Sequence, residues 1–410
     1  MAQDVNDIVR NGLCIGCGLC QSIAGENKLK MTMTAAGRLR PSLIQPLPAE
    51  ITTRIYSVCP GVRVEGLESR DNDPDFATDP IWGQSARLSI GYAADPHVRF
   101  KASTGGALSA LCIYLLESGR VDFILHVAAS KAQPMRSERH LSFDRSQVLE
   151  GAGSRYGPAA PLVDFCQLLD LERPFAFVGK PCDVAAVRNL AKIDPRVDKY
   201  VRYLLSPVCG GASELTLSHN IIARFGLEEA EVGLLRYRGN GNPGPTRIET
   251  KDGRTFEASY NEVWGDEAGW QLQARCKICP DAIGEQADIA VSDVWPGGSP
   301  QGEDAGFNGF IARTHKGLEL LKQAERANAV CLERPMSFRD LDLFQPHQVR
   351  KKQAVAARVL GMLLAGQMLP RFRRLRLLRS AWDAGLRHNL RNCLGMFRRS
   401  RQGKTREPAA

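Results

Sequence analysis

The placement of its cysteines is the feature that most constrains this chain. The sequence of 410 residues holds 12 cysteines, and acidic residues stand near its N-terminus where a secretory signal would be basic and then apolar. We therefore expect a cytoplasmic protein, in which disulfides are rare and clustered cysteines indicate metal or redox chemistry. Four cysteines stand alone among apolar or basic neighbours, and we interpret them as small hydrophobic side chains: Cys112, Cys166, Cys331 and Cys393.

The first cysteine group is a C-x2-C-x2-C run made of Cys14, Cys17 and Cys20, with Cys59-Pro60 following 39 residues later. Two-residue spacers let three thiolates converge on one small object, and the glycines between them let the backbone wrap it closely. Bacterial ferredoxins use this triplet with a Cys-Pro for iron–sulfur clusters. We predict a 4Fe-4S cluster on these four cysteines, with zinc or unligated thiols as the alternatives.

A second group of cysteines has small or turn-forming neighbours and lies outside hydrophobic runs. Cys182 is in GKPCD, Cys209 in SPVCGG, and Cys276 and Cys279 are in RCKICPD. A CxxC pair alone is typical of a redox pair or of half a zinc site. With the two further cysteines at strand ends, the set would be a complete group of four thiolates that only the fold can assemble. From spacing alone, a second metal centre is one of these alternatives.

The chain divides into four segments by composition and pattern. Residues 1–65 hold the triplet and form a small ferredoxin-like segment, and residues 66–90 are a polar, acidic linker. In residues 91–340, the helical pattern GALSALCIYLLESG precedes the strand pattern VDFILHVAA, and the strand FAFVG precedes the helix VAAVRNLA. This alternation predicts an α/β (or α+β) domain. Residues 341–410 are predicted to be helical.

The net charge of +9 is concentrated at the C-terminus. Residues 371–410 contain twelve Lys or Arg against Asp383 and Glu407, a balance of +10, so the rest of the chain sums to −1. A nearly neutral body argues against a nucleic-acid-binding core and confines any electrostatic partner to the tail.

Apolar residues recur in the tail at steps of three or four, with arginines between them. The pattern predicts one basic amphipathic helix from residue 371, with Pro370 at its first position. This helix would pack on its own domain, lie on an anionic membrane surface as a peripheral contact, or dock an acidic protein. No apolar run approaches the roughly 18 to 20 residues of a spanning helix. The apolar positions are Phe372, Leu375, Leu378, Trp382, Leu386 and Leu390.

Several segments in order resemble one known family. They are ASTGGALSALCIYLLESGRVDFIL, GSRYGP, FVGKPCDVAAVRNL, the Cys209-Gly210-Gly211 turn, CKICPDAIGEQADIAVSDVW and FIART. Over roughly residues 10–340 the chain resembles the beta subunits of coenzyme F420 hydrogenases and dehydrogenases. That family also includes hydroxymethyl-chlorophyll reductases and iron–sulfur divinyl-chlorophyllide vinyl reductases. The resemblance implies a second 4Fe-4S cluster on Cys182, Cys209, Cys276 and Cys279, and FAD in the α/β domain.

A glycine-containing loop is the first candidate for the flavin. Ser103-Thr104-Gly105-Gly106 precedes the helix predicted from Ala107, and small residues there would expose N–H groups suited to a pyrophosphate. The same pattern is typical of a helix cap with a turn, but the resemblance implies FAD against this loop. No GxGxxG follows a strand, so a nicotinamide site is unsupported. Further candidates, with packed-loop or core roles as the alternatives, are Arg155, Tyr156, Asp293 and Trp295.

Together these features predict an iron–sulfur flavoprotein oxidoreductase. A ferredoxin-type donor would pass electrons through two 4Fe-4S clusters to FAD and on to a small organic acceptor, either a chlorophyll-type pigment, a deazaflavin or a substrate not assigned. The alternative is a non-catalytic electron-transfer subunit of a larger membrane-proximal complex. No side chain in the sequence identifies itself as the proton donor.

Overall fold

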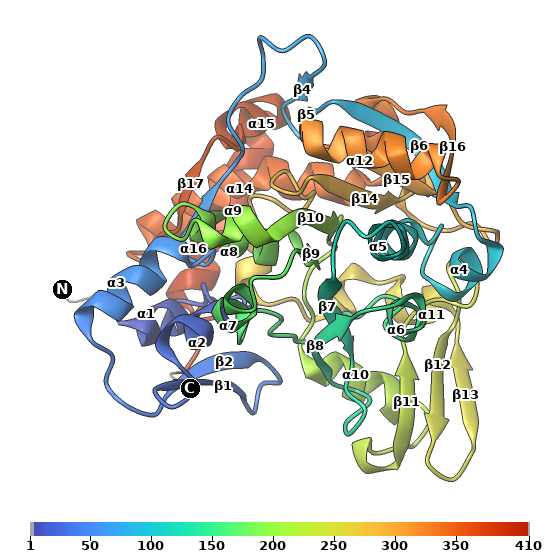
Figure 1. Cartoon of the computed structure of the whole chain (residues 1–410). Helices are drawn as coiled ribbons and strands as arrows, with labels where there is room; N and C mark the ends of the chain where they lie inside the picture. The colour runs from blue at the N-terminus through green and yellow to red at the C-terminus, as the bar shows by residue number, and fades with distance from the viewer. Residues whose placement is uncertain (1–3, 409–410) are drawn as a thin grey trace.

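A mixed sheet of eight strands is the centre of the computed structural model, which describes residues 4–408 (Figure 1). The strand order is β16-β6-β15-β14-β10-β9-β7-β8. Four central strands are parallel: β7 (Phe123–Ala129), β9 (Phe175–Val178), β10 (Val201–Pro207) and β14 (Ile289–Asp293). The strands outside them are antiparallel: β8 (Ser137–Ser142), β15 (Asn308–Ala312), β6 (Arg87–Ala93) and β16 (Val330–Pro335). The predicted α/β class is confirmed.

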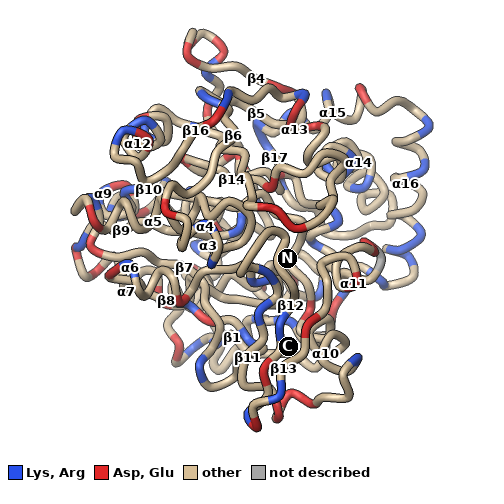
Figure 2. Tube along the Cα trace, turned by 90° about the vertical axis from the view of Figure 1, so that its right-hand side faces the viewer, with Lys and Arg blue, Asp and Glu red and all other residues tan. Residues whose placement is uncertain are grey.

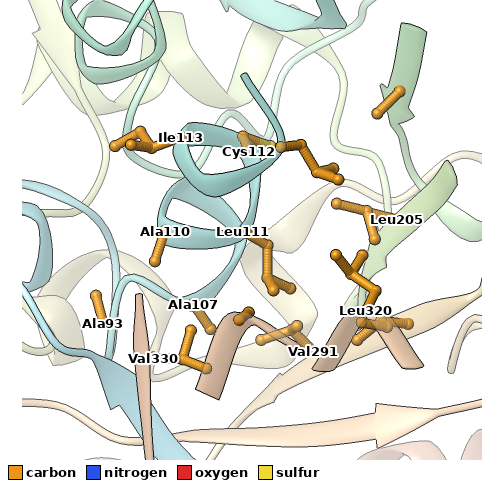
Figure 3. Packing of buried hydrophobic residues seen from close by; sticks show 14 of the residues in the cluster. Ala93, Ala107, Ala110, Leu111, Cys112, Ile113, Leu205, Val291, Leu320 and Val330 are labelled. Atoms are coloured by element: carbon orange, nitrogen blue, oxygen red, sulfur yellow. The ribbon is translucent and has the colours of Figure 1, made fainter. Parts of the chain in front are cut away.

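Helices cover both faces of this sheet. On one face lie α4 (Pro96–Lys101), α5 (Ala107–Glu117), α6 (Arg145–Glu150) and α12 (His315–Arg326). Figure 3 shows Leu111 of α5, Leu205 and Val291 of the sheet and Leu320 of α12 gathered in one apolar core. Cys112 is buried in the same core, as its apolar neighbours predicted.

The opposite face carries α7 (Phe165–Asp170), α8 (Pro181–Ala191) and α9 (Arg196–Tyr200). Phe175 and Phe177 of β9 point to this face, whereas Ala176 between them joins the core under α5. Side chains alternate in this way along any strand, and here both faces are apolar because both are covered. The helix-to-strand and strand-to-helix pairs predicted in residues 106–129 and 175–191 are present as α5–β7 and β9–α8.

A second, smaller sheet lies beside the main one and has its own core. It consists of β11 (Val232–Arg236), β12 (Thr246–Thr250) and β13 (Thr255–Ala258). Around it are α10 (Leu215–Ala223), η1 (Glu229–Glu231), α11 (Tyr260–Trp264) and η2 (Glu267–Trp270). Tyr237 and Trp264 are buried in this core, and Tyr156 packs against it from the main domain.

The N-terminal segment is packed into the rest of the molecule. Its elements are α1 (Val5–Arg10), α2 (Leu19–Ala24), β1 (Leu29–Met33), β2 (Leu39–Leu43), α3 (Ala49–Val58) and β3 (Arg63–Glu65). Ile8, Val9 and Leu13 share a core with Ile278 of the central domain and Met362 of the tail.

The segment expected to be a linker contains the hairpin of β4 (Ala77–Asp79) and β5 (Gly83–Ser85). Trp82 is fully buried, and its indole N–H donates to Asp342 at 2.8 Å. The buried Arg313 donates to the carbonyls of Gln84 at 3.1 Å and Ile283 at 2.9 Å. One tryptophan of the segment and one arginine distant in sequence attach the segment to the core. The polar composition of the segment does not indicate these two contacts.

The tail is not one helix from residue 371. Its order is α13 (Phe338–Phe344), α14 (Pro346–Leu364), strand β17 (Arg371–Arg373), α15 (Leu377–Ala384) and α16 (Leu386–Arg401). The central domain before it contains the short 3-10 helices η3 (Ala274–Ile278) and η4 (Pro296–Gly298). Pro370 therefore precedes a strand, and the prediction of a helix start there is wrong. Phe372 pairs with Val64 of β3 and Leu375 is buried beside it, so tertiary pairing overrides the local helical pattern. Within residues 4–408, no helix is long and apolar enough to cross a membrane.

Candidate functional site

The first cysteine group comes from the loop between α1 and α2, which holds Cys14 and Cys17, from the first turn of α2, which holds Cys20, and from Cys59 directly after α3. Gly16 and Gly18 have φ of +76° and +88°. A Cβ on Gly16 would lie 2.8 Å from the carbonyl oxygen of Leu39, and a Cβ on Gly18 would lie 2.6 Å from the side chain of Val163. Glycine is therefore needed at both positions, because it adopts positive φ and lets the loop turn against its neighbours.

The four cysteines of the first group lie within electrostatic reach of one another. Charges at Cys59 and Cys20 act on Cys17, and Cys14 acts on Cys20 and Cys59. Backbone N–H groups, among them that of Gly16, hydrogen-bond the sulfurs. Over residues 4–408, no three His, Cys, Asp or Glu side chains converge closely enough to share a single metal ion.

The second group is assembled from three separate parts of the central domain. Cys182 is in the first turn of α8, Cys209 follows β10, and Cys276 and Cys279 lie in and directly after η3. Cys182 interacts with Cys209 and Cys279, and Cys209 also interacts with Cys276. Electrostatic interactions therefore connect the four cysteines within each predicted set.

Burial dominates the ionisation of these thiols. It raises the pKa of seven of the eight, most of all where other thiols lie near, and Cys59 reaches about 11. All twelve cysteines are free. Thiolates that bind a metal here need compensating positive charge, because burial disfavours an uncompensated charge. Arg40, Arg275 and Lys351 supply this positive charge.

Two buried arginines connect the two groups. Arg275 donates to the carbonyl of Pro60 at 3.0 Å, next to Cys59, and to that of Ile278 at 3.2 Å, next to Cys279. Its charge lowers the pKa of both cysteines against the effect of burial.

Arg40 is the second arginine and interacts with Cys14 of one group and Cys276 of the other. Asp183 likewise acts on Cys17 and on Cys182. Charged groups that act on both sets show that the two sets are neighbours.

Glu407, near the C-terminus, forms an ion pair with the arginine beside the first cysteine group. Glu407 accepts two hydrogen bonds from Arg40, at 2.7 and 2.9 Å, and Arg40 also donates to Gln273 at 2.9 Å. Both Arg40 and Glu407 are buried. Sequence reasoning counted Glu407 only as one of two acids in a basic tail, since nothing local indicates its partner.

Helix α14 of the tail covers the second group. Lys351 donates to the carbonyls of Gly210 at 2.7 Å and Cys209 at 3.3 Å, and Gln348 donates to the Cys209 carbonyl at 2.9 Å. The positive charge of Lys351 lowers the pKa of Cys209 and of Cys279. The sequence carried no signal for this contact.

A cavity of about 390 Å³ runs from the first turn of α5 to Cys209. Seven of the eight residues predicted to contact a flavin line it; Gly105 does not, and lies instead against Asn308. Lys180 and Asp183, which form an ion pair of 2.6 Å, line the end near the second cysteine group. The predicted residues in the wall are Ser103, Thr104, Gly106, Arg155, Tyr156, Asp293 and Trp295.

Arg238 is the centre of the polar network in this cavity. It donates to Thr104 at 2.9 Å, Tyr156 at 3.2 Å and Asp293 at 3.2 Å, and its guanidinium lies 4.7 Å from the centre of the Trp295 ring. Thr104 also donates to Asp293. Arg238 joins three predicted residues from distant segments, but it follows β11 without any motif, so sequence reasoning missed it.

The other predicted residues differ in whether their hydrogen-bonding groups already have a partner. Ser103 accepts from the N–H and the hydroxyl of Ser154 at 2.9 and 3.0 Å. The Arg155 guanidinium donates to Ser137 and to the carbonyls of Pro134, Arg136 and Leu235, so it fastens the cavity wall. The indole N–H of Trp295, in contrast, is buried with no hydrogen-bond partner among the described residues.

These features define an α/β protein with two neighbouring groups of four buried or half-buried cysteines, the second of which adjoins an aromatic-lined cavity. The chain matches the family described as coenzyme F420 hydrogenase/dehydrogenase, beta subunit, with the N-terminal part at residues 89–166 and the C-terminal part at residues 172–337. The chain belongs to this family, as its motifs predicted.

Two curated relatives and one solved structure are similar to the chain. The F420-dependent formate dehydrogenase 1 subunit beta of Methanococcus maripaludis is 28% identical over 59% of this chain and 60% of the relative. The coenzyme F420-dependent sulfite reductase of Methanocaldococcus jannaschii is 24% identical over 83% of this chain and 50% of the relative. The chain thus spans half to three fifths of these relatives. A chain of the F420-reducing [NiFe] hydrogenase complex from Methanosarcina barkeri shares the fold, with a TM-score of 0.50 and 19% identity over 68% of this chain and 95% of that chain.

We predict that Glu407→Ala destabilises the protein, because it leaves the buried Arg40 without its carboxylate. Breaking a buried ion pair costs about 3 to 5 kcal/mol, measurable as a lower midpoint of urea unfolding. The matched control is Glu26→Ala, which removes an exposed ion pair with Lys30 at 2.8 Å and should cost no more than about 1 kcal/mol. Equal midpoints for the two variants would show that the end of the chain does not secure Arg40.

Proposed function

We propose that this protein is an oxidoreductase that carries electrons through two 4Fe-4S clusters and FAD to a small organic acceptor. One observation supports it above the others: the two cysteine groups share the buried charges of Arg40, Arg275 and Asp183. The cavity then begins at Cys209 of the second group. In this proposal, electrons enter from a ferredoxin-type donor near the N-terminal group and pass through the second group to the cavity.

The donor set fits iron–sulfur clusters. Each group offers four cysteine sulfurs, backbone N–H groups directed at them, and buried arginines or Lys351 that offset the negative charge of ligated thiolates. Hydrogen bonds to the sulfurs and the nearby charges are the means by which proteins set cluster potentials. The proposed ligands are Cys14, Cys17, Cys20 and Cys59 for one cluster, and Cys182, Cys209, Cys276 and Cys279 for the other.

The cavity fits a flavin in chemistry and in size. Its volume is within the usual range for cofactor sites, and α5 directs its N-terminus into it after Gly106, which has φ of +73°. The unpaired indole N–H of Trp295 supplies a buried donor that a bound group would satisfy. The ring of Tyr260 lies 5.2 Å from that of Trp295 and provides an aromatic wall.

Bound clusters would supply one-electron transfer, and a bound flavin would link it to the two-electron reduction of an organic acceptor. The chain's own residues hold the geometry. Arg238 fixes Thr104, Tyr156 and Asp293 in the cavity wall. His347 also lines the cavity, and burial lowers its pKa to about 4, so it is neutral near pH 7. The named relatives act with F420, which makes a deazaflavin the first acceptor to test, before a chlorophyll-type pigment or another substrate.

A second candidate is a non-catalytic electron-transfer subunit of a larger complex. The names of two relatives favour it, since both the formate dehydrogenase and the Methanococcus voltae hydrogenase proteins are beta subunits. Reduction of F420 by the isolated holoprotein with a reduced ferredoxin-type donor would favour the enzyme. A flavin that is reduced by the donor but does not turn over with an acceptor would favour the subunit.

We predict about eight iron per chain after anaerobic purification, because two cubane clusters hold four each. Cys59→Ser and Cys182→Ser should each retain about four, since each removes a ligand from only one group. Cys331→Ser, which changes a cysteine outside both groups, should keep the full content. Iron, sulfide and zinc analysis measures all four proteins; zinc in place of iron, or equal iron in every variant, would contradict the assignment.

We predict one FAD per chain, and its loss when the cavity is filled. Ser109 lines the cavity in the first turn of α5, so Ser109→Trp should place an indole where the flavin binds. Ser118→Trp at the exposed end of the same helix is the matched control and should leave the flavin in place. Flavin released on denaturation is compared with iron in both variants. Retention of FAD by Ser109→Trp would place the flavin elsewhere.

A further inference from the structure

The tail exposes a row of large apolar side chains on α15 and α16. They recur at every fourth residue, and each is between 52% and 82% exposed. Ser380, Ala381, Cys393 and Met396 on the other sides of these helices are buried. Packing on the domain therefore accounts for one face of each helix and leaves the apolar row uncovered. The row consists of Leu378, Trp382, Leu386, Leu390 and Leu394.

The end of α14 extends this apolar surface. Helices α14 and α16 are in close contact, because a Cβ on Gly361 would lie 2.4 Å from the carbonyl oxygen of Cys393. Arg358 donates to Asn392 at 3.0 Å on one side of that contact. With 3.6 residues per turn, the exposed leucines of both helices fall on the other side, so they form one surface. Those leucines are Leu360, Leu364, Leu390 and Leu394.

Exposed arginines lie beside the exposed leucines along α16. Arg387, Arg391 and Arg398 are exposed and form no ion pair with a described residue. Figure 2 shows the Lys and Arg positions along α16 at the right-hand edge of the molecule. The two acids of residues 371–410 do not neutralise it, because Glu407 is buried against Arg40 and Asp383 pairs with Arg379 at 3.3 Å.

We propose that α15, α16 and the end of α14 bind the surface of an anionic lipid bilayer. Leucines with a tryptophan on one face and arginines beside them are typical of helices that lie in the membrane interface. On α16 the exposed arginines lie directly beside the exposed leucines, with Arg387 after Leu386 and Arg391 after Leu390. The charge of the tail selects an anionic partner, and the protruding apolar side chains need an apolar medium to enter.

The test is co-sedimentation of the full-length holoprotein with vesicles. Vesicles of phosphatidylglycerol and phosphatidylcholine in equal parts are compared with vesicles of phosphatidylcholine alone, at low and at high salt. We expect binding to the anionic vesicles only, weakened by salt because electrostatic attraction is screened. Trp382 is exposed, in contrast to the buried Trp82, Trp264 and Trp295, so its fluorescence should shift to the blue on binding.

Two variants separate the contributions of charge and apolar contact. Arg387→Gln/Arg391→Gln/Arg398→Gln removes three charges and should weaken binding by about 100-fold, at about 1 kcal/mol per arginine. Trp382→Ala/Leu386→Ala should weaken binding and abolish the fluorescence shift. The charge-matched control is Lys199→Gln/Arg202→Gln/Lys251→Gln, at exposed positions outside the tail, which should bind as the wild type does. Unchanged iron and flavin contents verify that each variant folds.

Three results would overturn the proposal. They are no binding to anionic vesicles, equal binding to neutral ones, and binding that the tail variants do not change. Self-association that Trp382→Ala/Leu386→Ala abolishes, without vesicle binding, would assign the surface to a second copy of the chain. A requirement for an acidic protein in place of lipid would assign it to a protein partner.

Discussion

Compensation of buried sulfur by buried positive charge is the interaction on which the structure depends. Eight buried or half-buried cysteines lie in two groups, and burial disfavours the thiolate form. Arg40 and Arg275 lie between the groups, and Lys351 lies beside the second. Each of these side chains also makes hydrogen bonds to carbonyls or carboxylates, so its position is determined by the backbone around it. The fold therefore holds these three cations close to the sulfurs whose charge they offset.

This constraint explains why distant parts of the chain meet at one place. The N-terminal segment contributes four sulfurs, three from the triplet and one from Cys59. The central domain contributes strand ends and η3, and the tail contributes Lys351 and Glu407. The parallel strands β9 and β10 end on the same side of the sheet, which brings Cys182 and Cys209 together and opens the cavity beside them. The N-terminal segment therefore packs against the central domain and the tail.

Sequence reasoning reached the features that local spacing encodes. The C-x2-C-x2-C run, the helix after Ser103-Thr104-Gly105-Gly106 and the alternation of strand and helix are all short-range patterns, and the structure contains each of them. Arg238 and Lys351 are single residues without a motif, and only tertiary packing shows what they contact. The strand β17 was missed for a related reason: its pairing with β3 is a contact between residues about 300 apart in the chain, which no local periodicity reports.

In the tail, the net charge counted from the sequence does not show which charged residues are buried and which are exposed. Its balance of +10 is a single number, yet the residues behind it have two environments. Arg376 contacts the buried Glu285, and the chain returns at Glu407 to neutralise Arg40, so part of the segment belongs to the core. Arg387, Arg391 and Arg398 of α16 instead face solvent beside exposed leucines. One segment thus stabilises the cysteine groups with one side and presents an apolar, cationic surface with the other. Any contact made by that surface would act on the same helices that hold the sites in place.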